Sequence, residues 1–176
     1  MRAPLIAAAP RPAPVAFARL VASGFGSGYA PRAPGTAGSA VALLAGALLL
    51  WISPYALAAA MLLATFGGFW AVGRATGLPR RPAPGDMAGH DDPSWVVVDE
   101  FAGQFLALLA LPRPTPLGLL AAFVLFRLFD ILKPGPVGWA DRQGGVAGIM
   151  ADDVIAGGIA ALILWGVQAR WPGVFG

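Results

Sequence analysis

The sequence predicts an all-α integral membrane protein, a helical bundle of about four to five helices that span the membrane or are embedded in it. Apolar residues make up 57% of the 176 residues and charged residues only 12%, about half the charged share that is usual in soluble domains. The 24 glycines and 17 prolines fall between long runs of Ala, Leu and Val, where they indicate breaks between helices. The length suits a single domain.

Five apolar segments define the expected helices. They are residues 39–52, 55–72, 101–111, 117–132 and 149–169. The first two form a hairpin around Ser53 and Pro54, although the first is shorter than the ~20 residues of a full crossing. The third is short enough to be a half-span or a helix buried within the bundle.

A Pro/Ala-rich extension, residues 1–16, is expected to precede the membrane domain, residues 17–176. Prolines interrupt the apolar residues of this extension, so we expect no cleaved signal peptide. A short helix at the membrane surface is expected at residues 15–21.

Charge is sorted along the chain. The first 85 residues carry seven arginines and no acid, and all nine acids lie between Asp86 and Asp153. If the N-terminus is cytoplasmic, the hairpins return most basic residues to that side and leave Arg113 and Arg170 opposite. The positive-inside rule supports this orientation. The protein is then expected to cross the membrane several times, with its acids near helix ends at the cytoplasmic face.

Two pairs of neighbouring acids precede apolar segments. Asp99 and Glu100 stand before residues 101–111, and Asp152 and Asp153 stand at the start of the run that continues through Trp165. A charged side chain at membrane depth costs roughly 2.5 to 3.5 kcal/mol on insertion scales, so it usually faces a cavity, a cation or a partner. Favourable contact with a helix N-terminus is the alternative explanation. Because the arrangement occurs twice, we favour a functional site.

Carboxylates that converge from several helices suit a hard cation such as Mg²⁺, which prefers oxygen ligands. Arginine and lysine in the same layer complement phosphate oxygens. At a membrane surface this combination indicates metal-assisted chemistry on a phosphate ester whose other end is lipid. Other phosphatase designs are excluded, because the chain has no cysteine, a single histidine and no D-x-D-x-T segment. That histidine, His90, lies in a polar loop, where a solvated side chain is commoner than a functional one.

A glycine-rich loop, residues 23–38, could bring backbone amides close to an anion. Gly26, Gly28 and Thr36 are its candidate phosphate ligands. The loop has neither the lysine nor the spacing of a P-loop. A re-entrant or linker segment is the alternative interpretation.

Several motifs together resemble the bacterial phosphatidylglycerophosphatase A family, in the family's order and over residues 20–165. They are GFGSGYAPRAPGT (24–36), PSWVVVDEFAGQ (93–104), FRLFDILKPGP (126–136), ADR (140–142) and GIMADDVIAG (148–157). The resemblance implies a Mg²⁺-dependent inner-membrane enzyme that removes the terminal phosphate of phosphatidylglycerophosphate to give phosphatidylglycerol. Carried over by position, the functional candidates are Asp99, Glu100, Asp130, Lys133, Asp141, Arg142, Asp152 and Asp153.

Within this set we assign roles as hypotheses. Glu100, Asp152 and Asp153 are the first choices as Mg²⁺ ligands, and Asp99 or Asp130 is a further ligand or the catalytic base. The expected phosphate-binding side chains are those of Arg127, Lys133 and Arg142. Attack on phosphorus by water and attack by a carboxylate are both open.

Two rival functions use the same acids. A small membrane transporter or ion-coupled subunit would place them in an ion path, although no inverted repeat is evident. A lipid phosphotransferase would need a D-G-x2-A-R arrangement, which the sequence lacks. The expected partner is a phospholipid in the membrane and not a nucleic acid. The oligomeric state stays open, with a homodimer as one arrangement.

Overall fold

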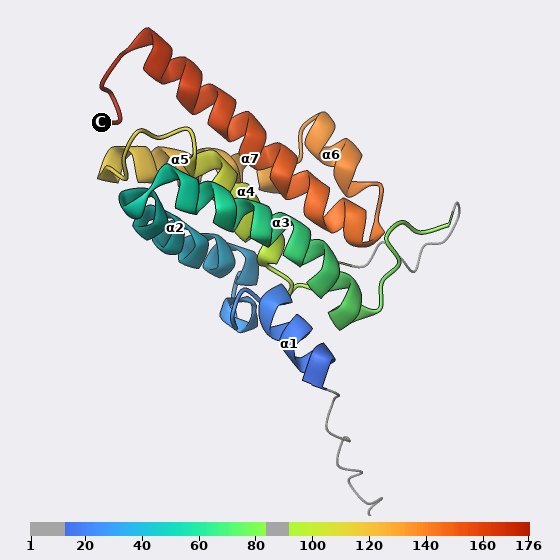
Figure 1. Ribbon diagram of the computed structural model, residues 1–176. Coiled ribbons are helices and arrows are strands. Elements are labelled where there is room, and N and C mark those ends of the chain that lie inside the picture. Colours follow the sequence, from blue (N-terminus) through green and yellow to red (C-terminus); the bar gives the residue numbers. More distant parts are fainter. Residues whose placement is uncertain (1–12, 84–91) are drawn as a thin grey trace, which may run out of the picture.

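The computed structural model describes residues 13–83 and 92–176, and over these ranges the chain is helical without strands (Figure 1). His90 and the first twelve residues of the expected extension lie outside them. The helices are α1 (Ala13–Ala22), the 3-10 turn η1 (Ser27–Tyr29), α2 (Pro34–Ile52), α3 (Pro54–Thr76), α4 (Val98–Leu108), α5 (Pro116–Leu132), α6 (Pro136–Asp141) and α7 (Gly145–Arg170).

Among the described residues, three helices are long and apolar enough to cross a membrane: α2, α3 and α7. Most of the residues in α2 and α3 are not buried inside the bundle, which fits a surface that faces lipid. Trp51 and Tyr55, at the turn between them, are 80% and 84% exposed, as expected of aromatic side chains at a membrane interface. The prediction of a helical membrane bundle is confirmed.

Helix α4 lies at the centre of this bundle, in contact with α2, α3 and α7 (Figure 1). All but one of its eleven residues are buried. Of the two expectations for this segment, the buried helix is therefore correct. Its first turn carries Asp99 and Glu100, Gln104 is buried one turn after Glu100, and the rest of the helix is apolar.

Proline and small polar residues set the helix ends. Helix α2 begins at Pro34, five residues before the expected start, and its 19 residues remove the shortfall in the first apolar segment. The side chain of Ser53 accepts a hydrogen bond of 3.1 Å from the amide of Tyr55, which caps α3. Helix α3 ends at Thr76 and is capped by Gly77, whose φ of 76° favours glycine.

The sequence expectation was wrong for the start of the final helix, which begins at Gly145 and not at residue 149. The amides of Val146 and Ala147 donate hydrogen bonds of 3.1 and 3.0 Å to the carbonyl groups of Pro79 and Arg80. These distant acceptors stabilise a glycine-rich start that would be a poor helix N-terminus alone. Asp152 and Asp153 consequently lie two turns inside α7, so contact with the helix N-terminus does not explain them.

The short helix expected at residues 15–21 is confirmed as α1, which packs against α3. The rings of Phe17 and Trp70 lie 6.1 Å apart at this contact. Helix α1 includes residues 13–16 of the expected extension.

Candidate active site

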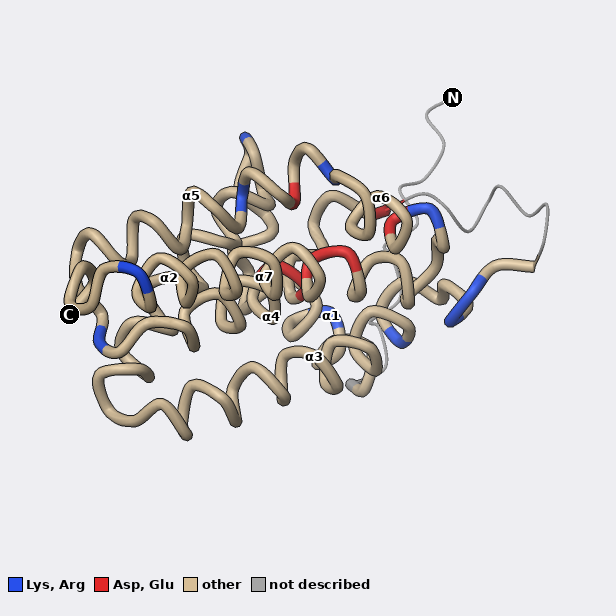
Figure 2. Tube along the Cα trace, turned by 90° about the horizontal axis from the view of Figure 1, so that it is seen from above, with Lys and Arg blue, Asp and Glu red and all other residues tan. Residues whose placement is uncertain are grey.

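Three carboxylates from two helices meet inside the bundle. Ligand oxygens of Asp99, Glu100 and Asp153 all lie within 4.8 Å of one another, and the three side chains are buried. Figure 2 shows acidic segments clustered in the half of the bundle nearer α6, and the described residues at the end that carries the C-terminus are free of them. Three buried acids in one place require a cation or protons.

A close helix crossing brings Asp153 to α4. Gly103 on α4 and Gly157 on α7 face each other, and a Cβ on Gly157 would lie 2.8 Å from the Cα of Gly103. A Cβ on Gly103 would in turn lie 3.0 Å from the carbonyl carbon of Asp153. Because both positions lack a side chain, the backbones can approach and the acids of α4 and α7 can share one site.

A network centred on Arg127 forms the second wall of the site. Its guanidinium lies 3.9 Å from a carboxylate oxygen of Glu100, forms an ion pair with Asp130, and donates a hydrogen bond of 3.3 Å to the Ser39 hydroxyl. The start of α2 also lies here, since a Cβ on Gly35 would collide with Glu100 and lie 3.6 Å from the Arg127 guanidinium. Helices α2, α4 and α5 therefore meet at Glu100.

A separate ion-pair chain holds Asp152. The ammonium of Lys133 donates a hydrogen bond of 2.7 Å to Asp152 and also pairs with Asp141. Lys133 ends α5 in a left-handed conformation with φ of 47°, which is uncommon for a residue with a side chain. The structure thus divides the Asp152–Asp153 pair: Asp153 joins the acids of α4, and Asp152 faces Lys133.

The other candidate phosphate ligands lie further out. The amides of Gly26 and Gly28 donate hydrogen bonds of 3.1 and 3.0 Å to the carbonyl of Ser23, so their local turn already uses them. Thr36 is exposed on the first turn of α2, and Arg142 is exposed after α6. The structure does not bring Gly26 or Gly28 into the carboxylate cluster.

Several buried polar atoms near the cluster find no hydrogen-bond partner among the described residues. They are Glu100 Oε2, Arg127 Nε and both amide atoms of Gln104. Gln104 is fully buried and lies one turn from Glu100 on α4. Sequence reasoning missed it, although its spacing of four from Glu100 was the available signal. Buried groups of this kind indicate a ligand that would pair with them.

Burial and neighbouring charges raise the pKa values of several side chains in and around the site. Burial raises the pKa of Asp99 and Glu100 above the usual range, and for Glu100 the neighbouring Asp99 adds to the effect. Asp92 is an exposed loop residue, yet partial burial of its carboxyl group and the charges of Asp99 and Asp152 raise its pKa to about 8. Burial lowers the pKa of Lys133, but hydrogen bonds to Asp141 and Asp152 outweigh it and leave the pKa above its ordinary value.

Sequence comparison gives a family that accounts for this arrangement. The profile of phosphatidylglycerophosphatase A matches residues 20–168, which include every helix that contributes to the site. The chain belongs to the phosphatidylglycerophosphatase A family.

Three relatives align with this chain over most of its length. Phosphatidylglycerophosphatase A of Escherichia coli is 39% identical over 87% of this chain and 84% of its own length. The protein of the same name from Haemophilus influenzae is 38% identical over 85% of this chain and 87% of its own. A Bacteroides thetaiotaomicron protein with the provisional name of a phosphatidylinositol-3-phosphatase is 40% identical, over 86% and 92%. No solved structure gives a significant match.

The names of these relatives agree on a phosphatase that acts on a lipid, so this member of the family is a phosphatase enzyme. Its three converging carboxylates can hold a divalent cation. The partly exposed guanidinium of Arg127, beside Glu100, can bind oxygens of a phosphate group.

Proposed function

We propose that this enzyme is a Mg²⁺-dependent phosphatase that hydrolyses the terminal phosphate monoester of phosphatidylglycerophosphate to phosphatidylglycerol and phosphate. The observation that carries the proposal is the buried cluster of Asp99, Glu100 and Asp153 beside Arg127. The family profile and the names of the E. coli and H. influenzae relatives support the choice of substrate.

The donor set fits Mg²⁺. Asp99, Glu100 and Asp153 offer only carboxylate oxygens, and Glu100 Oε2 has no hydrogen-bond partner among the described residues. These three residues would hold the ion, which when bound neutralises charge on the phosphoryl group and polarises it. Asp152, which we also expected as a ligand, instead binds Lys133.

Residues of the chain bind and orient the phosphate. Arg127 is placed to hold its oxygens, and the ion pair with Asp130 keeps the guanidinium in position. The start of α2 lies against Glu100 and the Arg127 guanidinium at Gly35, so amides of its first turn can donate to phosphate oxygens bound there. Lys133, which is paired with Asp152, is the candidate donor of a proton to the glycerol oxygen when its bond to phosphorus breaks.

We further propose that the site faces the cytoplasm. Arg74 lies in the last turn of α3 and Lys133 pairs with Asp152 near the site, whereas Arg113 lies beside Trp51 at the turn after α2 and Arg170 ends α7. The chain has no cysteine, so single-cysteine variants test this directly. Arg81→Cys should react with an impermeant thiol reagent from the cytoplasmic side, and Ser53→Cys from the periplasmic side. The reverse pattern would overturn the orientation.

The deciding experiment measures phosphate release from phosphatidylglycerophosphate in detergent micelles, with Mg²⁺ and with excess EDTA. Wild-type protein should release phosphate only with the metal. Asp153→Asn should remain folded and lose at least about 100-fold in turnover. Phosphatidylinositol 3-phosphate and phosphatidic acid serve as comparison substrates, because one relative carries a phosphoinositide name. No release from any of the three by folded protein would favour the transporter alternative.

A further inference from the structure

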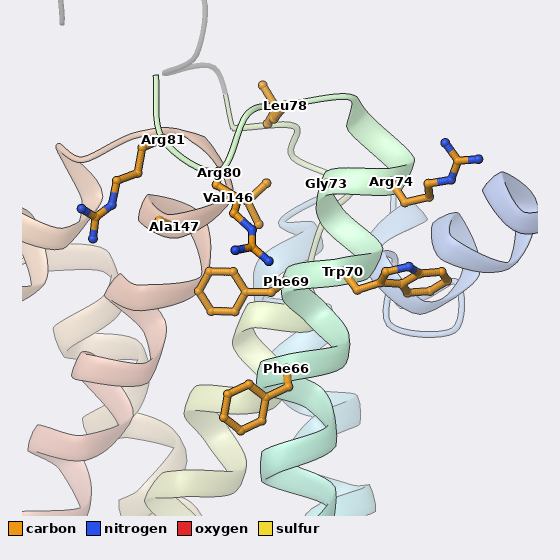
Figure 3. Close-up of a pocket in the computed structure, with 10 residues that line it drawn as sticks. All are labelled: Phe66, Phe69, Trp70, Gly73, Arg74, Leu78, Arg80, Arg81, Val146 and Ala147. Carbon is orange, nitrogen blue, oxygen red and sulfur yellow. The ribbon is translucent and has the colours of Figure 1, made fainter. Parts of the chain in front are cut away.

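A groove of about 860 Å³ lies outside the carboxylate cluster, between the end of α3 and the start of α7. Figure 3 shows aromatic side chains from α3 along its lower part and arginines around its upper part. The aromatic residues are Phe66, Phe69 and Trp70, and the arginines are Arg74, Arg80 and Arg81. None of the lining residues belongs to the carboxylate cluster or to the Arg127 network.

The backbone that carries the arginines is fixed. The carbonyl groups of Pro79 and Arg80 accept the hydrogen bonds of Val146 and Ala147 that begin α7. Gly145 packs directly on this segment, since a Cβ there would lie 3.2 Å from the Arg80 carbonyl oxygen. Arg80 thus stands between α3 and α7 at a defined position, and its guanidinium points down toward Phe69 (Figure 3).

The groove is positively charged and its described lining contains no acid. Within the described residues, the carboxylates that form ion pairs do so with Arg127 and Lys133 and not with Arg74, Arg80 or Arg81. The arginine side chains are exposed. An anion is therefore the ligand that complements this end of the groove.

The aromatic end of the groove is suited to an apolar group of a ligand. Phe66 is 70% exposed and Trp70 is 49% exposed, on a helix long enough to cross the membrane. The arginines follow the last turn of that helix, so they lie at the level of lipid head groups and the aromatic side chains lie below them. A ligand that fills both ends is amphipathic, with a negative head and a hydrocarbon chain.

We propose that this groove binds an anionic phospholipid, in addition to the molecule that is hydrolysed, with its phosphate on Arg80 and Arg81 and an acyl chain along Phe66 and Phe69. Bound lipid would hold the segment that caps α7. Helix α7 carries Asp152 and Asp153, so this site would connect the charge of the bilayer to the stability of the catalytic end. The proposal needs the membrane location of α3 but not the hydrolytic reaction.

The test is equilibrium binding of phosphatidylserine with a fluorescent acyl chain to the purified protein in neutral detergent micelles. Wild-type protein should bind it and should bind phosphatidylcholine with the same chain far more weakly. The double variant Arg80→Gln/Arg81→Gln should bind phosphatidylserine about 30-fold more weakly, because each of the two basic residues contributes about fivefold to the affinity for an anionic lipid. The matched control is Arg113→Gln/Arg170→Gln, which removes the same charge at the opposite end and should bind normally.

Three outcomes would overturn the proposal. Equal loss in the two double variants would mean general attraction by net charge. Unchanged binding in Arg80→Gln/Arg81→Gln would place the lipid elsewhere. Competition by inorganic phosphate as effective as competition by unlabelled phosphatidylserine would mean a simple anion site without the aromatic contribution. Since phosphatidylserine is neither the proposed substrate nor its product, failure here leaves the proposed hydrolysis untouched.

Discussion

Gly103 and Gly157 bring α4 and α7 so close that a methyl group on either would overlap the backbone of the other helix. This contact lies one turn from Asp153, whose carbonyl carbon would be 3.0 Å from a Cβ on Gly103. Small residues permit such backbone approach between helices in membranes, where hydrophobic association is weak. The packing of the bundle and the assembly of the carboxylate cluster therefore depend on the same pair of residues.

Gly157→Ala is expected to damage both properties. Its methyl group would meet backbone, which cannot rotate away, so we expect a loss of about 1 to 3 kcal/mol in unfolding free energy. Displacement of Asp153 should lower phosphate release at least about tenfold. Gly158→Ala is the matched control, because its Cβ would lie at an ordinary 3.7 Å from Leu106. Thermal unfolding and activity of the two variants test this, and equal behaviour would contradict the helix contact.

Lys133→Met is expected to destabilise the protein because it leaves Asp152 buried without its cation. The loss should be about 1 to 3 kcal/mol, less than for a fully buried pair, since water reaches the lysine side chain. Adding Asp152→Asn to this variant should recover part of the stability, whereas Asp152→Asn alone should destabilise. Thermal melts of the four proteins give the coupling between the two residues. Strictly additive effects would show that the ion pair contributes nothing.

Gln104→Leu is expected to raise the melting temperature. The amide atoms of Gln104 are buried without partners among the described residues, and each such group costs about 1 to 3 kcal/mol. Phosphate release should fall, because we expect this amide, one turn from Glu100, to find its partner in the bound ligand. Gln168→Leu is the control and should lower the melting temperature, since Gln168 donates a hydrogen bond of 2.7 Å to the Ala110 carbonyl. Unchanged turnover in Gln104→Leu would remove Gln104 from the site.

The stability of the metal-free protein is expected to fall as pH rises from about 5 to 8. Burial raises the pKa of Asp99 and Glu100 from the ordinary values of 3.8 and 4.5, so the folded state retains protons that the unfolded chain has released. Unfolding then releases protons, and higher pH favours it. With saturating Mg²⁺ the trend should reverse, because protons and metal compete for the same oxygens.

Melting temperatures at three pH values, in EDTA and in Mg²⁺, check this sign. Glu100→Gln should flatten the slope in EDTA, because the amide does not titrate. A melting temperature that rises with pH in EDTA would contradict the assignment of buried protons to these acids.

Much of the fold could be predicted from the sequence because prolines mark where several of its helices begin. Proline at positions 54 and 116 can begin a helix but cannot continue one, so the hairpin and the α5 start were predictable. The start of α7 was not, because Gly144 and Gly145 resemble a linker until the carbonyl groups of Pro79 and Arg80 supply acceptors. Those acceptors come from the other half of the chain and leave no local signal.

The candidate site was predictable in composition but not in arrangement. Adjacent residues on a helix differ in direction by about 100°, so the sequence could not say which of Asp152 and Asp153 faces α4. The answer depends on the rotation of α7, which the contact at Gly157 sets. Gln104 was missed because its one sequence signal, the spacing of four from Glu100, does not reveal that its amide is buried without partners among the described residues.

The division of the cluster between α4 and α7 also determines when the site forms during synthesis. Asp99 and Glu100 enter the membrane with α4, and Asp153 follows only with α7. Until then the nascent chain holds two of the three acids, without the third that completes the cluster. A chain interrupted between these helices would therefore carry an incomplete cluster, which we expect neither to hold a cation tightly nor to release phosphate.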